Sequence, residues 1–238
     1  CNGNQLFPGE YGMKHAKCVE DTFHLAGELG VDTIVMMSGL PGSCREDRHP
    51  NWVTCLFPEM EKVLDYQWND VAIPYWEKTA SLALKCGIKK ISIELHSNQL
   101  VYNYSSLMRL RNAIGTVIGA NLDPTHLFWM GADPIAIAKA LLQENALFWT
   151  HIKDLHINSR AAALHTVLET RTCENSEDLS WDYTPVGNGH SVYWWRSFVK
   201  NITEGGYTAP FGIEIGHKYA PDNMKELNAA LKLLICAK

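Results

Sequence analysis

The sequence lacks the features that mark membrane proteins and nucleic-acid-binding proteins. No apolar run approaches the ~20 residues that a transmembrane helix needs, and the N-terminal stretch CNGNQLFPGE lacks the charged-then-apolar layout of a signal peptide. The chain has 21 lysines and arginines against 26 aspartates and glutamates, so its formal net charge is −5. It lacks the excess of positive charge that is typical of nucleic-acid-binding proteins. We therefore expect neither a membrane nor a nucleic acid as a partner, which leaves small molecules.

The cysteines also form no recognisable pattern. There are seven, an odd number, and they form neither a disulfide framework nor a CxxC metal motif. This usage indicates a reducing compartment, and we expect a cytoplasmic protein. The cysteines stand at positions 1, 18, 44, 55, 86, 173 and 236.

What the chain does contain is an alternation of helix and strand patterns. With 238 residues and 46% apolar residues it can bury a sizeable core, and we expect a single domain over residues 1–238.

Pro74 interrupts one helical stretch, where we expect a kink or a break. Residues 155–190 are less regular. Helices are predicted over residues 17–30, 58–87, 105–115, 133–145, 191–206 and 222–237, and strands over 30–39, 89–96, 116–123, 146–154 and 209–216.

Strands that alternate with helices predict parallel βα units, in either a doubly wound sheet or a (β/α)8 barrel. Four successive strands end on Glu94, Asp123, His151 and Glu214, each a metal ligand or an acid–base group. In a barrel the carboxyl ends of all strands converge on one face, where active sites lie. A doubly wound sheet has no such common mouth, so the strand ends favour the TIM barrel.

The composition of this group predicts one divalent metal ion. Two glutamates, one aspartate and one histidine form a hard, mostly oxygen ligand set that suits Mn²⁺, Mg²⁺ or Co²⁺ and is compatible with Zn²⁺. Three converging carboxylates would also repel one another strongly without a cation.

Several long segments resemble the xylose isomerase-like family of sugar phosphate isomerases and epimerases, which are TIM barrels. The resemblance extends over nearly all of the chain, with the segments in the same order. The segments are IGANLDPTHLFWMGADPIAIAKAL, THIKD, WDYTPVGNGHSVYWWRSFVKNITEGGYTAPFGIEI, and the pair PNWVTCLFP and QWNDVAIPYWEKTA. The resemblance implies that Glu94, Asp123, His151 and Glu214 bind the cation. It further implies that His126, in the loop after Asp123, contacts substrate, and that Lys153 and Asp154 match the family's HxKD string.

The resemblance also implies a mechanism and a place in carbohydrate metabolism. The cation would stabilise an enediolate formed from a small sugar or a polyol-derived ketone, while Glu94 and Glu214 remove and return a proton. Return to the other face epimerises the centre, return to the neighbouring carbon isomerises the substrate, and loss of a β-hydroxyl dehydrates it. The sequence does not choose between these reactions. Barrels of this kind often form dimers or tetramers, so a homo-oligomer is compatible with the resemblance.

Further candidates for substrate contacts are less specific. His96 should share the face of Glu94, His190 stands in a GNGH turn, and Trp52 could stack on a sugar face. Each has a structural alternative, and Lys153 could equally be an ion-pair partner of Asp154. The aromatic residues at 67–76 and 193–195 are expected in the outer core.

The chain departs from the family at both ends. If Glu214 follows the eighth strand, the strand at 30–39 is the fourth, so two βα units and most of a third strand are absent, about 60 to 70 residues of a fold of ~250 or more. We therefore predict a partial barrel. Glu214 is followed by Ile215, Gly216 and His217 where family members often read His-Glu-Asp.

Two alternative interpretations of the function stay open. A module without catalytic activity could keep the fold and bind a sugar or a partner. A phosphodiesterase of the apurinic-site endonuclease type is disfavoured, because it needs more histidine ligands and a basic groove.

Overall fold

The computed structural model describes residues 3–171, 178–215 and 223–235, and its contacts divide the chain into two compact units. The first unit comprises Cys1–Asn121 with Asn145–Phe148, and the second comprises Leu122–Glu144 with Trp149–Lys238. Two strands, β3 and β4, contribute residues to both units. The single domain expected over residues 1–238 stays a prediction.

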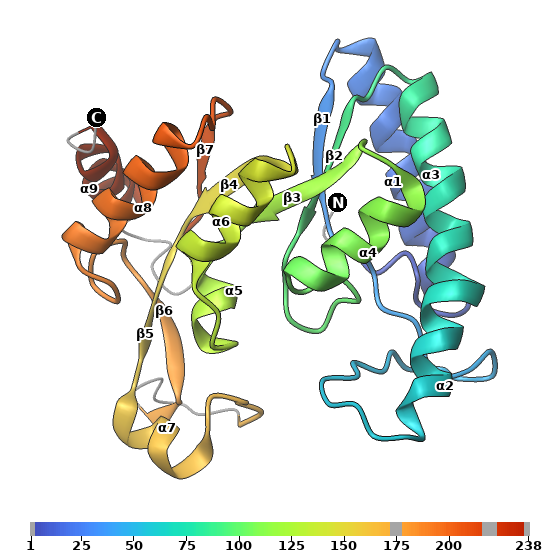
Figure 1. Cartoon of the computed structure of the whole chain (residues 1–238), viewed down its shortest axis with the longest axis horizontal. Coiled ribbons are helices and arrows are strands. Elements are labelled where there is room, and N and C mark those ends of the chain that lie inside the picture. The colour runs from blue at the N-terminus through green and yellow to red at the C-terminus, as the bar shows by residue number, and fades with distance from the viewer. Residues whose placement is uncertain (1–2, 172–177, 216–222, 236–238) are drawn as a thin grey trace. The chain divides into compact units, whose positions relative to one another are not determined.

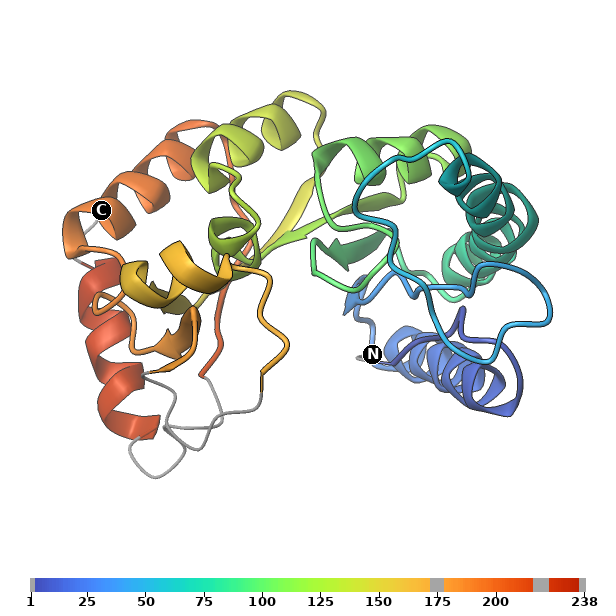
Figure 2. The ribbon, with the colours of Figure 1, turned by 90° about the horizontal axis from the view of Figure 1, so that it is seen from below.

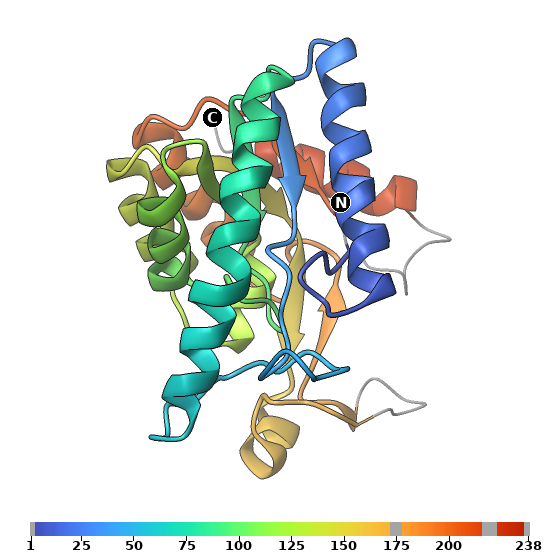
Figure 3. The ribbon, with the colours of Figure 1, turned by 90° about the vertical axis from the view of Figure 1, so that its right-hand side faces the viewer.

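The first unit is a set of parallel strands covered by helices. Strands β1 and β2 pair in parallel, as do β2 and β3, with Glu94 opposite Asn121. Helices α1, α3 and α4 lie on one side of these strands, and α1 and α3 run alongside β1 (Figures 1 and 3). The elements are α1 (Glu10–Glu28), β1 (Thr33–Met36), α2 (Met60–Asp65), a π-helical segment (Tyr66–Ala72), α3 (Ile73–Lys85), β2 (Lys90–Glu94), α4 (Tyr104–Ile114) and β3 (Ile118–Leu122).

The second unit repeats this arrangement and adds a hairpin-like pair. Strand β4 pairs in parallel with β7, and β5 pairs with β6 in antiparallel fashion. Helices α6, α8 and α9 follow one another in contact (Figure 2). The elements are α5 (Pro124–Trp129), α6 (Pro134–Gln143), β4 (Leu147–Ile152), β5 (Asp154–Ile157), α7 (Ser159–His165), β6 (Trp181–Thr184), α8 (Val192–Glu204), β7 (Phe211–Ile213) and α9 (Asn223–Ile235).

The strands are buried as parallel strands should be. Ile91 and Ile93 of β2 are fully buried, and so are Ile118, Ala120 and Leu122 of β3. Because helices cover parallel sheets, such strands read as apolar runs without strict alternation. This explains why the sequence pattern identified all five strands that follow the βα order.

The fold is that of a partial TIM barrel. Strands β1, β2, β3, β4 and β7 correspond to the fourth to eighth strands of the predicted numbering, and the described residues contain no earlier strand. The prediction of a partial barrel is confirmed.

The helix around Pro74 does not break, which corrects one of the two outcomes predicted there; the kink stays a prediction. Helices α2 and α3 are joined by the π-helical segment, in which the N–H of Ile73 bonds to the carbonyl of Trp68 five residues earlier. Proline has no N–H and its ring crowds the preceding turn. The wider π turn accommodates Pro74 in the first turn of α3 without ending the helix.

Other differences concern residues 155–190 and 191–206. Strands β5 and β6 and helix α7 occupy part of the stretch expected to be irregular. Tyr193 was expected in the core but is 81% exposed, whereas Trp195 is fully buried. No helix among the residues that the structure describes is long and apolar enough to cross a membrane.

Candidate metal and substrate site

Asp123 is the most buried member of the candidate site. It follows β3 directly and caps α5, where its Oδ1 accepts hydrogen bonds from the N–H and the Oγ1 of Thr125 at 2.9 and 2.7 Å. Its Oδ2 accepts no hydrogen bond from the described residues. That oxygen instead faces three nitrogens, His126 Nε2 at 3.4 Å, His151 Nδ1 at 3.9 Å and Lys153 Nζ at 4.0 Å.

His151 and Lys153 approach Glu214 together. They are two residues apart in extended chain, so their side chains leave on the same side. His151 Nδ1 lies 3.1 Å from Glu214 Oε2, and Lys153 Nζ donates to Glu214 Oε1 at 2.8 Å. Gly212 stands opposite His151 in β7, where a Cβ atom would lie 2.9 Å from Trp149 Nε1 and 3.1 Å from His151 Cδ2. Glycine at this position therefore makes room for the Trp149 indole and the His151 imidazole.

These contacts form one cluster in the second unit, which we call the second-unit cluster: Asp123, His126, His151, Lys153 and Glu214. The predicted position of His126 needs correction, because the residue lies in the short helix α5 instead of a loop and is 1% exposed. The Asp123 side chain starts that helix, and its third residue is His126, one turn away on the same side.

The electrostatics of the cluster keep both carboxylates ionised. Burial by itself raises the pKa of Asp123, but His126, His151, Lys153 and Thr125 lower it more, so the net shift is well below the ordinary value. The hydrogen bond from His151, with the contribution of Lys153, lowers the pKa of Glu214 to about 2 against the opposing effect of burial. Burial lowers the pKa of Lys153, yet Asp123 and Glu214 raise it more, so the ammonium stays charged.

Three members of the cluster fit a divalent cation. Asp123, His151 and Glu214 each offer a ligand atom, and these atoms lie within 4.8 Å of one another. Metal–ligand distances of ~2.0–2.6 Å allow one cation to reach all three. The unsatisfied Oδ2 of Asp123 is the acceptor that such a cation would engage. Lys153 already supplies one positive charge, so the argument from carboxylate repulsion is weaker than the sequence indicated.

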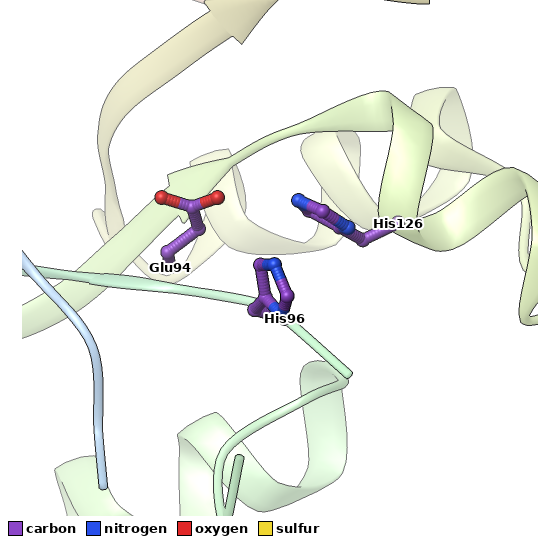
Figure 4. Close-up of side chains that lie close together, drawn as sticks. All are labelled: Glu94, His96 and His126. Atoms are coloured by element: carbon purple, nitrogen blue, oxygen red, sulfur yellow. The ribbon is translucent and has the colours of Figure 1, made fainter. Parts of the chain in front are cut away.

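Glu94 and His96, the next two predicted residues, belong to the first unit. Glu94 ends β2, is 5% exposed, and its Oε2 accepts a hydrogen bond from Asn121 Nδ2 at 3.1 Å. A ligand atom of His96 lies within 4.8 Å of one of Glu94, so the two side chains share a face as predicted. Figure 4 shows both leaving the chain at the end of β2, and His126 leaving α5.

His190 and Trp52 have well-defined structural surroundings. His190 Nδ1 lies 2.9 Å from Asp154 Oδ1, and its ring stacks on Phe128 with centroids 3.6 Å apart. Trp52 belongs to the first unit and packs edge-on against Tyr102. Their predicted roles in substrate binding stay predictions.

The alternative pairing of Lys153 with Asp154 is wrong. Lys153 pairs with Glu214 and Asp123, while Asp154 is fully buried and bonds to His190, Trp195 and the loop at 187–190. Adjacent residues in extended chain point to opposite sides, which separates the two side chains.

Sequence reasoning missed two residues beside the candidate site. Tyr183 in β6 places its ring under Lys153 Nζ at 4.3 Å and lies edge-on to His126. Asn121, within the apolar run of β3, orients Glu94. The alternation in Trp181-Asp182-Tyr183-Thr184 is the signal that could have identified β6. Gly216 and His217, named for the departure after Glu214, lie outside the described residues.

Comparisons with known proteins agree with the fold. The family model described as xylose isomerase-like TIM barrel matches residues 8–235. The uncharacterized protein YfiH of Bacillus subtilis (strain 168) is 44% identical over 218 residues, which are 90% of this chain and 69% of that protein.

Solved structures match at the level of the fold. The IOLI protein with a bound zinc atom gives a TM-score of 0.65 at 16% identity, covering 99% of this chain and 74% of that chain. The probable 3-DHS dehydratase AsbF of Bacillus anthracis gives 0.64 at 17% identity, covering 98% and 74%.

Proposed function

The chain belongs to the xylose isomerase-like TIM barrel family, and on that premise we propose that it is a divalent-metal-dependent isomerase or epimerase. Its substrate would be a small sugar or a polyol-derived ketone. The observation that carries this proposal is the convergence of Asp123, His151 and Glu214, with ligand atoms within 4.8 Å of one another. Glu94 at the end of β2 is the proposed fourth ligand.

The donor set supports Mn²⁺, Mg²⁺ or Co²⁺, with Zn²⁺ also compatible. The zinc atom in the IOLI protein is in keeping with a metal centre in this fold. When bound, such a cation supplies Lewis acidity, which makes the hydrogen next to a substrate carbonyl easier to remove. The remaining functions fall to side chains of this chain.

Glu214 is the proposed proton acceptor of the second unit. Its contacts with His151 and Lys153 hold the carboxylate ionised and fix its orientation. Glu94, oriented by Asn121, is the proposed partner that exchanges a proton on the other side of the substrate. General acid–base catalysis of this kind contributes typically about 10²–10⁴-fold in rate.

His126, Lys153 and Tyr183 are the proposed contacts for substrate oxygens. Lys153 retains its charge and lies between the ring of Tyr183 and the carboxylate of Glu214. A charged donor in a largely buried position stabilises negative charge on a neighbouring oxygen more strongly than it would in water. We assign His96, His190 and Trp52 to the same substrate-binding role only as predictions from the sequence.

Proton exchange in deuterated water tests the function without knowledge of the product. The protein with Mn²⁺ is incubated with a panel of ketoses and inososes, and loss of the proton signal next to the carbonyl is followed by NMR. We expect exchange with at least one compound, slowed about 100-fold or more in Glu214→Gln and Glu94→Gln. Glu204→Gln, an exposed change at the end of α8, is the matched control and should exchange at the wild-type rate.

The outcomes separate the alternatives. Exchange followed by loss of water would favour a dehydratase, the reaction in the name of AsbF. Tight binding of a sugar without exchange by metal-loaded protein would contradict the proposal and favour the binding module.

A further inference from the structure

A cavity of about 360 Å³ lies in the first unit, among residues that follow β1 and β2. Its size falls in the range of about 300–1,000 Å³ that is usual for small-molecule sites. Its walls come from the segment after β1, from α2 and the π-helical segment, from the segment after β2 and from the start of α4. None of its lining residues belongs to the second-unit cluster.

Aromatic side chains provide flat apolar walls. Trp52, Trp68 and Tyr102 line the cavity, with Trp52 and Tyr102 edge-on at 5.5 Å. Trp68 is 3% exposed and belongs to the π-helical segment. Such segments occur frequently at functional sites. A ring-shaped or planar ligand is the natural complement of these walls.

One cation, Arg109, lines the cavity, and the carboxylate of Asp65 is near enough to act on its charge. Of the described lining residues, Arg109 alone carries a charge, and it forms no ion pair in the described part of the chain. Its guanidinium carbon lies 4.4 Å from the centroid of Trp68. Loss of water around the group lowers the pKa of Arg109, with Asp65 opposing the shift. A guanidinium held over an aromatic ring can still donate its N–H groups to an oxyanion.

The start of α4 adds a second anion-binding element on the same side. Ser105 also lines the cavity, and it lies one turn from Arg109 on the same helix face. The capping box between Asn103 and Ser106 engages the N–H of Ser106, while the N–H of Ser105 has no acceptor among the described residues. The N-terminus of a helix favours negative charge.

Buried polar atoms in the walls are typical of a binding site. Gln67 lines the cavity and is fully buried. Its Nε2 is fixed by the carbonyls of Pro41, Gly42 and Asn51. Its Oε1, like the Nε1 of Trp52, has no hydrogen-bond partner within the described residues. Unsatisfied buried polar atoms are rare in protein cores.

We propose that this cavity binds a small organic anion, with its ring against Trp52 and Trp68 and its carboxylate or phosphate at Arg109 and the start of α4. This site uses none of the residues of the second-unit cluster, and it shares only Trp52 with the substrate contacts proposed above. Carboxylate and phosphate share the chemistry that Arg109 recognises.

Binding of three probes tests the proposal. Benzoate and phenyl phosphate carry a ring and an oxyanion, whereas benzyl alcohol carries the ring alone. The chain has eight tryptophans, and the indole N–H signals of Trp52 and Trp68 can be assigned in ¹H–¹⁵N spectra by single Trp→Phe changes. We expect at least one anion to shift these signals saturably and benzyl alcohol to bind at least about tenfold more weakly.

Charge variants identify the anion site. Arg109→Gln and Ser105→Glu should each weaken binding of the anion about tenfold or more, the first by removing the cation and the second by adding a negative charge. Arg160→Gln, an exposed change of the same charge in the second unit, should leave binding unchanged. The proposal is overturned if neither anion shifts the two signals, if benzyl alcohol binds equally well, or if both charge variants bind like wild type.

Discussion

Asp154 accepts hydrogen bonds from several segments of the second unit, and replacing it with asparagine should destabilise that unit. The residue is fully buried. Its Oδ2 accepts from the N–H groups of Gly187, Gly189 and His190 and from the indole of Trp195 at 3.0–3.2 Å. Its Oδ1 accepts from the N–H of Leu155 and lies 2.9 Å from His190 Nδ1.

An asparagine amide would meet donors in either orientation. With its NH₂ group in place of Oδ2, at least three donors lose their acceptor. With the NH₂ group in place of Oδ1, the N–H of Leu155 faces a donor even if His190 changes tautomer, and the other contacts lose the negative charge. A buried donor left without a partner costs about 1–3 kcal/mol, and bonds to an ionised acceptor are about twice as strong as neutral ones. We therefore expect a loss of about 2 kcal/mol or more.

Urea denaturation of wild type, Asp154→Asn and Asp133→Asn measures this loss. Asp133 is an exposed N-cap of α6, where asparagine caps equally well, so its variant should change the free energy of unfolding by less than about 0.5 kcal/mol. A similarly small change for Asp154→Asn would refute the idea that this carboxylate holds the loop at 187–190 and α8 in place.

Three more perturbations follow from the structure. Asn103→Ala removes the capping box of α4 and should cost about 1 kcal/mol in urea denaturation, while Asn103→Asp should cost little; equal losses would contradict the cap. The metal-free chain should lose stability as pH falls from about 5 toward 2. The pKa of Glu214 is about 2 in the folded state against an ordinary value of 4.5, so in this range protons bind the unfolded state more readily and favour it. Lys153→Met should flatten that decline in pH-dependent melting, and an unchanged profile would exclude the pairing. Gly212→Ala should weaken Mn²⁺ binding about 10-fold in calorimetry, because the added Cβ would crowd both the indole of Trp149 and the ring of His151, and unaltered affinity would show that the His151 ring does not need this space.

The order of strands and helices could be predicted from the sequence, because each buried element leaves a local pattern of apolar residues. Apolar runs such as the one around Ile91 and Ile93 identify strands, and the Asp133-Pro134 start identifies α6. The same Asp-Pro signal at Asp123-Pro124 starts α5, yet a helix of six residues carries too little periodicity to be recognised. His126 was therefore expected in a loop.

The remaining errors come from tertiary packing. The π-helical segment buries Gln67 and Trp68, and the presence of Pro74 does not specify that a π turn will accommodate it without a break. Asp154 was considered a partner of Lys153 because the two are adjacent in sequence, but the alternation of extended chain sends them to different neighbours. Tyr183 was missed because β6 has four residues and, within the described part of the chain, pairs with β5 alone.

Calorimetric titration with Mn²⁺ shows whether Asp123, His151 and Glu214 hold one divalent cation. The whole chain is stripped with a chelator, and wild type is compared with Asp123→Asn, Glu214→Gln and the exposed control Glu204→Gln. We predict one ion per chain for wild type and the control, and binding lost or weakened at least about tenfold in the two ligand variants. A wild type that does not bind Mn²⁺, or ligand variants that bind it as wild type does, would contradict the metal centre.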